Sequence, residues 1–366
     1  MNKNTSLLVA AVSATMFASL SHAFEFDAGD TKVNLGGYAK FDVSYNDPGY
    51  DISGTVAPAG TVKGIDKDAD ATIDMSARQS RFWLKTATPK GEGTLKTHVE
   101  FDLYGAAGTE TVSNSHSLRL RHAYGTLNNV LMGQTWSTFM DLHTLPEIID
   151  FTQPTSAIFN RQAQVRYTIP MGSGKLSVAA ENPSSYGTDK NSIPDLIAKY
   201  DYNTKTVHAS AALMVRQLKI NNDDSKTAGA LSLNAKVKLS NGDDVRVQLN
   251  GGALGRYMGL AAHRGHEGSG STFDVVNSYG ASVAYRHVWA EGVRSTLVAS
   301  ATKADNNVAS ANLLDGSQSV HLNILWDVAK AVTLGVEVQH REVEFFDTTK
   351  ADVKADRLQF SAKYGF

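Results

Sequence analysis

The sequence predicts an all-β protein, a transmembrane, antiparallel, up-and-down β-barrel of sixteen strands. Three observations lead to this expectation. The chain begins with an export signal, and its residues alternate between apolar and polar along most of its length. The links between the alternating segments are alternately short and long.

The composition limits the function before any motif is considered. The 366 residues carry 35 Lys plus Arg against 37 Asp plus Glu, a net charge of −2 that argues against a nucleic-acid-binding protein. Cysteine is absent, which excludes a disulfide-stapled domain and a Cys-ligated zinc or redox site. Hydrophobic residues make up 42% of the chain, enough for a large folded body.

Residues 1–23 have the organisation of a secretory signal peptide. Lys3 supplies a positive charge, residues 6–20 are apolar or small, and the sequence ending at Ala23 fits the small-x-Ala cleavage rule. We therefore expect a mature chain that starts at Phe24 and forms one barrel domain, residues 24–366. A membrane anchor is the alternative, but the apolar stretch is too short for one. No later segment approaches eighteen apolar residues, so an exported chain of this kind is either soluble or a closed membrane barrel.

Alternation at period two is clearest in the segment 32–46. One face is apolar or small and the other polar: Val33, Leu35, Gly37, Ala39, Phe41, Val43 and Tyr45 against Lys32, Asn34, Tyr38, Lys40, Asp42 and Ser44. A strand with one apolar and one polar face has this pattern. Sixteen such segments are predicted, near 32–46, 76–88, 94–105, 117–127, 130–136, 160–169, 175–182, 195–203, 206–220, 229–239, 245–257, 274–287, 293–303, 317–327, 332–345 and 355–366.

The links between these segments alternate in length. Short ones such as 128–129 and 171–174 are rich in Gly and Asn and predict hairpin turns, whereas 47–75 and 137–159 are long. Outer-membrane barrels have short periplasmic turns and long external loops, and an even strand number places both termini in the periplasm. A soluble β-sandwich is the alternative, but its strands are usually shorter and its loops do not alternate so regularly.

The C-terminal segment ends in the alternating aromatic residues Phe360, Tyr364 and Phe366. The last strand of a barrel must pair with the first, because an open edge in lipid leaves backbone groups unsatisfied. A terminal Phe with apolar residues upstream resembles the signal that the barrel-assembly machinery reads. We therefore expect this segment to direct assembly.

Several short motifs, taken together in this order, carry a family resemblance: Ser80-Arg81-Phe82, Leu118 to Gly125 (LRLRHAYG), Gly133 to Ser137 (GQTWS), Arg161 to Tyr167 (RQAQVRY) and the closing Phe366. The mature chain resembles the DcaP-like outer-membrane porins. The resemblance implies a trimer of sixteen-stranded barrels in the outer membrane of a Gram-negative bacterium, passing small, often anionic solutes such as dicarboxylates. We predict no enzyme activity and no cofactor.

The polar face of the predicted strands carries more bases than acids, because many acids lie in loops. A basic, water-filled channel concentrates anions. The bases expected to form one wall of the pore are Lys40, Arg81, Lys85, Arg119, Arg121 and Arg166. Guanidinium binds carboxylate through two parallel hydrogen bonds, so stacked Arg side chains can pass an anion along. The alternative is that these Arg residues only pair with acids and stiffen the barrel.

The third outer loop, 137–159, is too apolar for a loop that projects freely into solvent. In porins of this size such a loop folds into the barrel, and the resemblance supports the same expectation here. Folded inward, Asp141, Glu147 and Asp150 would face the Arg wall and create a transverse field. An outer cap packed on neighbouring loops is the alternative.

Other functions have weaker support in the sequence. The segment His263-Arg264-Gly265-His266-Glu267 has two histidines three apart, but a solvated loop is the better interpretation, and no metal is predicted. No Ser/His or paired-acid arrangement indicates catalysis, and the other histidines are scattered, with His122 and His340 on the apolar face. Two alternatives stay open: a non-transport barrel (adhesin, structural protein or hydrolase) and a sugar- or peptide-selective porin. Small anions, outer-membrane lipid, the assembly machinery and two further copies of the chain are the expected partners.

Overall fold

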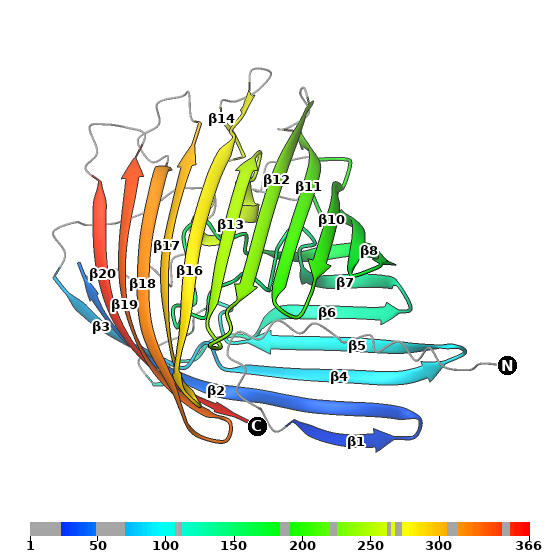
Figure 1. Cartoon of the computed structure of the whole chain (residues 1–366), viewed down its shortest axis with the longest axis horizontal. Helices are drawn as coiled ribbons and strands as arrows, with labels where there is room; N and C mark the ends of the chain where they lie inside the picture. Colours follow the sequence, from blue (N-terminus) through cyan, green and yellow to red (C-terminus); the bar gives the residue numbers. More distant parts are fainter. Residues whose placement is uncertain are drawn as a thin grey trace.

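Sixteen strands form a closed antiparallel barrel (Figure 1). The computed structural model describes residues 23–48, 70–106, 108, 112–183, 191–219, 225–261, 265–267, 273–305, 314–345 and 352–366. The predicted signal peptide therefore lies outside the described residues, apart from Ala23, and so do His263 and Arg264.

The barrel strands follow one another around the ring in chain order. They are β2 (Thr31–Asp47), β4 (Arg81–Lys90), β5 (Gly93–Asp102), β6 (Arg119–Leu127), β7 (Val130–Trp136), β8 (Arg161–Met171), β9 (Gly174–Glu181), β10 (Asp195–Asn203), β11 (Val207–Lys219), β12 (Ser225–Lys238), β13 (Asp244–Gly252), β16 (Ser278–Ala290), β17 (Val293–Ala304), β18 (Leu314–Ala329), β19 (Val332–Phe345) and β20 (Val353–Gly365). Strand β20 pairs with β2 and closes the ring. Each predicted segment overlaps one of these strands, so the predicted fold class is confirmed.

Some elements were not predicted. Strand β1 (Phe24–Ala28) forms a hairpin with the start of β2, and β3 (Thr72–Ser76) pairs with the far half of β2, so that β3 and β4 together form one interrupted strand. The predicted strand 245–257 is too long, because β13 ends at Gly252 and the 3-10 helix η2 (Gly255–Ala261) follows. Two short strands, β14 (His266–Glu267) and β15 (Asp274–Val275), pair in the next loop.

The alternation separates an apolar outer surface from a polar interior. Leu213, Leu249 and Val283 point outward and are about half exposed, whereas Ser232, Asn234 and Gln248 are buried inside. This arrangement is the reverse of a soluble protein, and it suits a barrel whose outer face meets lipid. Among the described residues, no helix is long and apolar enough to cross a membrane.

The loop between β7 and β8 (residues 137–160, here called loop 3) folds into the barrel, as predicted. The backbone N–H groups of Ile149 and Asp150 donate to the carboxylate of Glu337 on β19, at 2.7 and 3.0 Å. The N–H of Ser156 donates to Ser300 Oγ on β17 at 3.0 Å. Side chains of the wall therefore accept hydrogen bonds from backbone N–H groups of the buried loop. The loop has no regular secondary structure that would provide acceptors for these groups.

The apolar core lies inside the barrel and not between the barrel and a second layer. Phe139 and Leu145 of loop 3 pack with Met214 of β11 and with Leu254 and Tyr257 at η2, and all of these side chains are buried. The inner side of the wall is therefore apolar at this cluster, whereas polar residues such as Glu337 and Ser300 contact other parts of loop 3. Loop 3 and η2 act as a plug that occupies part of the interior.

A β-bulge on β6 changes the direction of one predicted side chain. The register between β5 and β6 shifts at Arg121, so that Glu100 lies opposite His122 and Phe101 lies opposite Leu120. The extra residue moves His122 from the outward face to the interior, where its Nδ1 lies 2.9 Å from Thr135 Oγ1. The outward position inferred for His122 was therefore wrong, whereas His340 does lie on the outer face, opposite Asp356.

Candidate functional site

Three of the predicted wall bases, Arg81, Arg119 and Arg121, come together inside the barrel and pair with acids of β5. Arg119 donates to both oxygens of Asp102, from Nε at 2.9 Å and from Nη2 at 2.6 Å. Arg121 bridges the two acids, with Nε 2.7 Å from Glu100 and Nη1 2.9 Å from Asp102. Arg81 Nε lies 3.3 Å from Glu100. The bulge at Arg121 lets Arg119, Arg121 and His122 all point inward from one short strand.

A fourth guanidinium, Arg161, joins this group from the start of β8. Its Cζ lies 4.3 Å from the centre of the Trp136 ring, and that of Arg121 lies 5.8 Å from the same ring. Arg161 Nη1 is buried and has no hydrogen-bond partner among the described residues. Sequence reasoning missed Arg161 because strict alternation puts it on the outward face. It is the first residue of its strand, where the pleat does not yet fix the side chain.

We call Arg81, Arg119, Arg121 and Arg161 the arginine cluster. Three of these guanidinium groups pair with two carboxylates, Glu100 and Asp102, and Arg161 lies beside them without an ion-pair partner among the described residues, so the cluster has a formal excess of positive charge. Its members differ in access, because the side chain of Arg119 is 29% exposed and that of Arg121 only 1%. The guanidinium of Arg119 is therefore accessible to a solute, whereas that of Arg121 is covered and contributes only its charge.

A row of aromatic rings connects Arg119 with Arg161. The guanidinium of Arg119 lies 5.0 Å from the ring centre of Tyr104 and 5.2 Å from that of Phe151. Phe151 also contacts Phe159 (6.2 Å between ring centres), and Phe159 contacts Trp136 (4.9 Å). Two of these rings belong to loop 3, so the loop supplies one side of the aromatic row. Planar cations stacked on aromatic faces keep their N–H edges available for an anion.

The other three predicted wall bases lie apart from the arginine cluster. Lys40 Nζ lies 3.0 Å from Asp42 and donates to the carbonyl oxygen of Ile149 in loop 3 at 3.3 Å. Lys85 lies over the ring of Trp83, 5.1 Å from its centre. Arg166 donates to Gln164 and to the carbonyl oxygen of Trp136, and no described carboxylate lies within ion-pair distance of it.

The three loop 3 acids do not face the Arg wall, contrary to the prediction. Their partners are bases of other strands: Glu147 pairs with Arg294 on β17 at 2.8 Å, Asp150 with Arg357 on β20 at 3.4 Å, and Asp141 with Lys199 on β10 at 3.2 Å. The physical reason is local neutralisation, since Glu100 and Asp102 already balance part of the arginine cluster. The bases of β10, β17 and β20 attract the loop acids instead.

These contacts favour the ionised form of two of the loop acids, Asp141 and Asp150. Burial by itself would raise the pKa of Asp141, but Lys199 and hydrogen bonds from His208 and Ser210 hold it well below the ordinary value. Burial would also raise the pKa of Asp150, and Arg357 and Arg341 lower it. In the same loop, burial and the neighbouring His208 lower the pKa of His143 to about 4.

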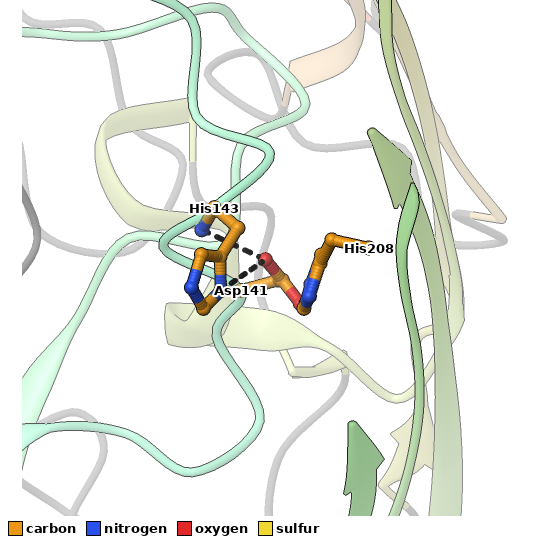
Figure 2. Close-up of side chains that lie close together, drawn as sticks. All are labelled: Asp141, His143 and His208. Carbon is orange, nitrogen blue, oxygen red and sulfur yellow. Dashed lines mark hydrogen bonds and ion pairs between the residues drawn. The ribbon is translucent and has the colours of Figure 1, made fainter. Parts of the chain in front are cut away.

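Asp141 is also part of a compact group with His143 and His208 (Figure 2). The closest nitrogen or oxygen atoms of the three side chains all lie within 4.8 Å of one another. His208 comes from β11 and the other two from loop 3, and the two imidazole centres are 4.2 Å apart. No local motif announced this group, because the loop and the strand are far apart in the sequence.

The outer surface of β4 to β8 has a group of polar and small outward positions among exposed apolar residues such as Met132 and Val165. Its outward positions include the mutually hydrogen-bonded Thr86 and Thr97, with Gly125, Gln134 and Ala163 beside them. Gln134 donates its amide to the carbonyl oxygen of Leu120. Outward positions on β11, β13 and β17 include Leu213, Leu249 and Leu297, each about half exposed.

A family model described as DcaP outer membrane protein matches residues 2–366. The chain belongs to this family. It is similar in structure to the outer membrane channel DcaP of Acinetobacter baumannii, with 28% identity, a TM-score of 0.82, and coverage of 94% of this chain and 99% of that chain. This DcaP-family chain is therefore an outer-membrane porin, as the sequence resemblance implied.

More distant porins share the fold. An anion-selective porin from Comamonas acidovorans matches with a TM-score of 0.64 and 12% identity, over 92% of this chain and 100% of that one. OmpF of Salmonella typhi, in a complex with daunomycin, matches with a TM-score of 0.63 and 12% identity, over 94% and 100%. No protein with a curated description matches this DcaP-family chain.

Proposed function

We propose that this chain forms a passive diffusion channel for small solutes, that it prefers anions of the dicarboxylate type, and that it has no enzymatic role. One observation carries the proposal: the arginine cluster has four guanidinium groups for two carboxylates, and Arg161 Nη1 has no described partner. Carboxylates bind guanidinium groups through two parallel hydrogen bonds, so an entering diacid is the natural partner for this excess charge.

The solute path that we propose runs between loop 3 and the wall formed by β4 to β8. Elsewhere in the barrel, Asp141, Glu147 and Asp150 pair with bases of β10, β17 and β20, which leaves the excess positive charge at the arginine cluster. Loop 3 acts as the constriction in this proposal. Arg166 and Lys85 extend the basic path, since neither is paired with a described carboxylate.

The aromatic row favours solutes with a flat apolar part. Tyr104, Phe151 and Trp136 lie beside Arg119 and Arg161, so a carboxylate held by an arginine would have a ring face next to it. We therefore expect an aromatic diacid to pass at least as well as an aliphatic one of similar length. A sugar-selective porin is the second candidate, because sugar channels also use aromatic rows.

We further propose that three copies form a homotrimer through the outer surface of β4 to β8. Polar groups such as Gln134 and Thr97 are costly against lipid and are suited to a protein interface. A porin of the same fold, OmpT of Vibrio cholerae, is described in a trimer form. Migration as a large species in gels that becomes small on boiling would support the trimer.

The export and orientation that we propose follow from the same family. Residues 1–23 are removed on export, and the short turns and both termini face the periplasm. Phe360, Tyr364 and Phe366 would be recognised by the barrel-assembly machinery, and their side chains point outward on the last strand or just after it. Mass spectrometry of the protein purified from outer membranes tests cleavage after Ala23.

Planar bilayers and liposome swelling test the transport proposal. We expect a reversal potential in a salt gradient that indicates anion preference, and faster entry of succinate and an aromatic diacid than of a neutral sugar or a diamine. The double variant Arg119→Ala, Arg121→Ala should lower the anion preference. Faster entry of the sugar would favour the sugar porin, and a folded sample that carries no current would indicate a non-transport barrel.

A further inference from the structure

We propose that Asp141, His143 and His208 form a binding site for a divalent transition metal ion, for which Zn²⁺ is the appropriate probe. The site lies inside the barrel, where loop 3 meets the start of β11 (Figure 2). It is separate from the arginine cluster, whose members come from β4, β6 and β8. Two imidazole nitrogens and a carboxylate oxygen are the ligands that zinc takes in open, three-ligand sites.

The geometry needs only a small adjustment to hold the ion. His208 Nε2 lies 2.8 Å from Asp141 Oδ2, and His143 Nδ1 lies 4.0 Å from Asp141 Oδ1. Ligand atoms around tetrahedral zinc lie roughly 3.3 Å apart, because each is about 2.0 Å from the metal. One ligand atom from each of the three residues lies within 4.8 Å of the others, so relative movements of up to about 1.5 Å, shared among the side chains, bring them to coordinating distance. The side chain of His143 is 33% exposed, so an ion can reach the group from water.

The hydrogen bonds of His208 orient it as a metal ligand. Its Nδ1 lies 2.7 Å from Asn203 Oδ1, and its Nε2 faces the carboxylate of Asp141. A neutral imidazole has one N–H and cannot donate to both oxygens. When an ion binds, the hydrogen bond between His208 and Asp141 gives way: Nδ1–H donates to Asn203, and the lone pair of Nε2 and the carboxylate of Asp141 both face the ion. Metal-bound histidines are held by a hydrogen bond of this kind from the other ring nitrogen.

Lys199 is the charge that competes with the metal. Its Nζ lies 3.2 Å from Asp141 Oδ2, but it also lies 3.1 Å from Asp201 and donates to the carbonyl oxygen of Met140 at 3.0 Å. If Asp141 turns to a metal ion, Lys199 keeps these two partners. Ser210, which donates to the same carboxylate oxygen of Asp141, can turn to another acceptor because a hydroxyl rotates freely.

The site is tested by calorimetry, in which Zn²⁺ is titrated into the full-length barrel. The protein is purified in detergent and treated with EDTA beforehand. We expect one Zn²⁺ per protomer in the wild type. His143→Ala and His208→Ala should each weaken binding by at least about tenfold, and Asn203→Leu, which removes only the orienting partner, by about 10- to 100-fold. His143 has few contacts, so His143→Ala should still assemble, and heat-modifiable migration in gels checks this.

The control is His340→Ala. His340 Nδ1 lies 2.7 Å from Asp356 on the outer face, and among the described residues this His–Asp pair belongs to no group of three metal-ligating side chains. Wild-type binding in this variant supports the proposal. Absence of Zn²⁺ binding in the wild type overturns it, as does binding that persists in the His143→Ala, His208→Ala double variant. Binding that is lost in His266→Ala would move the site to the loop near β14 and would also overturn it.

Discussion

Arginine residues of this porin have different roles because their partners and exposure differ. Arg121 is buried and bridges Glu100 and Asp102, so its charge is needed to hold those acids inside the barrel. Arg161 has no described acid within ion-pair distance, and its guanidinium is stacked on Trp136. Removal of Arg121 takes a positively charged partner away from two acids, Glu100 and Asp102. Removal of Arg161 takes no ion-pair partner from any described acid.

We predict that Arg161→Ala lowers anion selectivity with a small effect on stability. The stacking contact with Trp136 contributes about 1–2 kcal/mol, whereas Arg121→Ala should cost about 3–5 kcal/mol because it breaks a buried ion-pair network. Reversal potentials in bilayers measure selectivity, and heat-induced unfolding followed in gels measures stability. Equal loss of stability in the two variants would contradict the different roles assigned here.

The acids of loop 3 predict a pH dependence of stability. A carboxyl group whose pKa is depressed by folding stabilises the protein above its unfolded pKa of about 3.9, and this contribution is lost as the pH falls through the depressed value. We predict that Asp150→Asn is less stable than the wild type at neutral pH, because Arg357 loses its acid. The difference should be constant between about pH 5 and pH 7 and should shrink below about pH 4.

Thermal unfolding of both proteins across this pH range checks the prediction for Asp150. The control is Asp356→Asn, since the side chain of Asp356 is 73% exposed and its pair with His340 lies on the surface. Such pairs contribute little, so this variant should follow the wild type. A difference between Asp150→Asn and the wild type that persists unchanged to about pH 2 would contradict the assigned role of Asp150.

At the scale of elements, loop 3 depends on close contact with the inner wall. Gly280 on β16 faces inward, and a Cβ placed there would lie 2.8 Å from the Cβ of Ser156 in loop 3. The N–H of Ser156 donates to Ser300 and its carbonyl oxygen accepts from Asn250, so this part of the loop is fixed between two strands. A side chain at position 280 would push the loop away from both partners.

We predict that Gly280→Val lowers barrel stability by about 1–3 kcal/mol and alters single-channel conductance, because overpacking displaces loop 3. The matched control is Gly229→Ala on β12, where the new Cβ would meet only the carbonyl oxygen of Met214 at 3.4 Å, an ordinary contact. Thermal unfolding and bilayer conductance measure both variants. Unchanged conductance in a destabilised Gly280→Val barrel would argue against loop 3 as the constriction.

At the scale of the whole molecule, ring closure depends on the last residues of the chain. The backbone of Phe366 exchanges two hydrogen bonds with Gly37, at 3.0 and 3.1 Å. Its ring lies 5.9 Å from that of Phe82. Position 37 requires glycine, because a Cβ there would lie 2.4 Å from the carbonyl oxygen of Arg81 and 2.7 Å from the Phe366 ring.

We predict that deletion of Phe366 reduces the yield of folded barrel more than Phe366→Ala does. The deletion removes both backbone hydrogen bonds at the seam as well as the ring, whereas the substitution keeps the backbone bonds. The folded fraction is measured by heat-modifiable migration of outer-membrane preparations. Equal yields of the two variants would show that only the ring of Phe366 matters for assembly.

Most of the barrel could be predicted because a strand in a membrane barrel shows its two faces in local alternation. The segments 130–136, 195–203 and 332–345 were predicted with the bounds that the structure has. The errors lie where alternation stops being informative. The sequence of η2 continues the pattern of β13 for a few residues, and the bulge at Arg121 reverses the parity of His122 without any change in composition.

The candidate site was predicted less completely. The inward direction of Arg81, Arg119 and Arg121 follows from alternation, but their partners do not, because Glu100 and Asp102 come from a neighbouring strand whose exact register only pairing fixes. Arg161 escaped notice because it lies at a strand end. The partners of loop 3 could not be read from the sequence, since a loop has no periodicity.

The sequence by itself determined the strands, the apolar outer face, the inward bases and the closing aromatic residue of this porin, because each depends on residues close together in the chain. Tertiary structure alone decided which charges meet. Ile149 and Glu337 are 188 residues apart when they bond, and His208 meets Asp141 across 67 residues. Contacts of this kind depend on the path of loop 3 through the interior, and that path is set by the summed packing and charge of the whole wall.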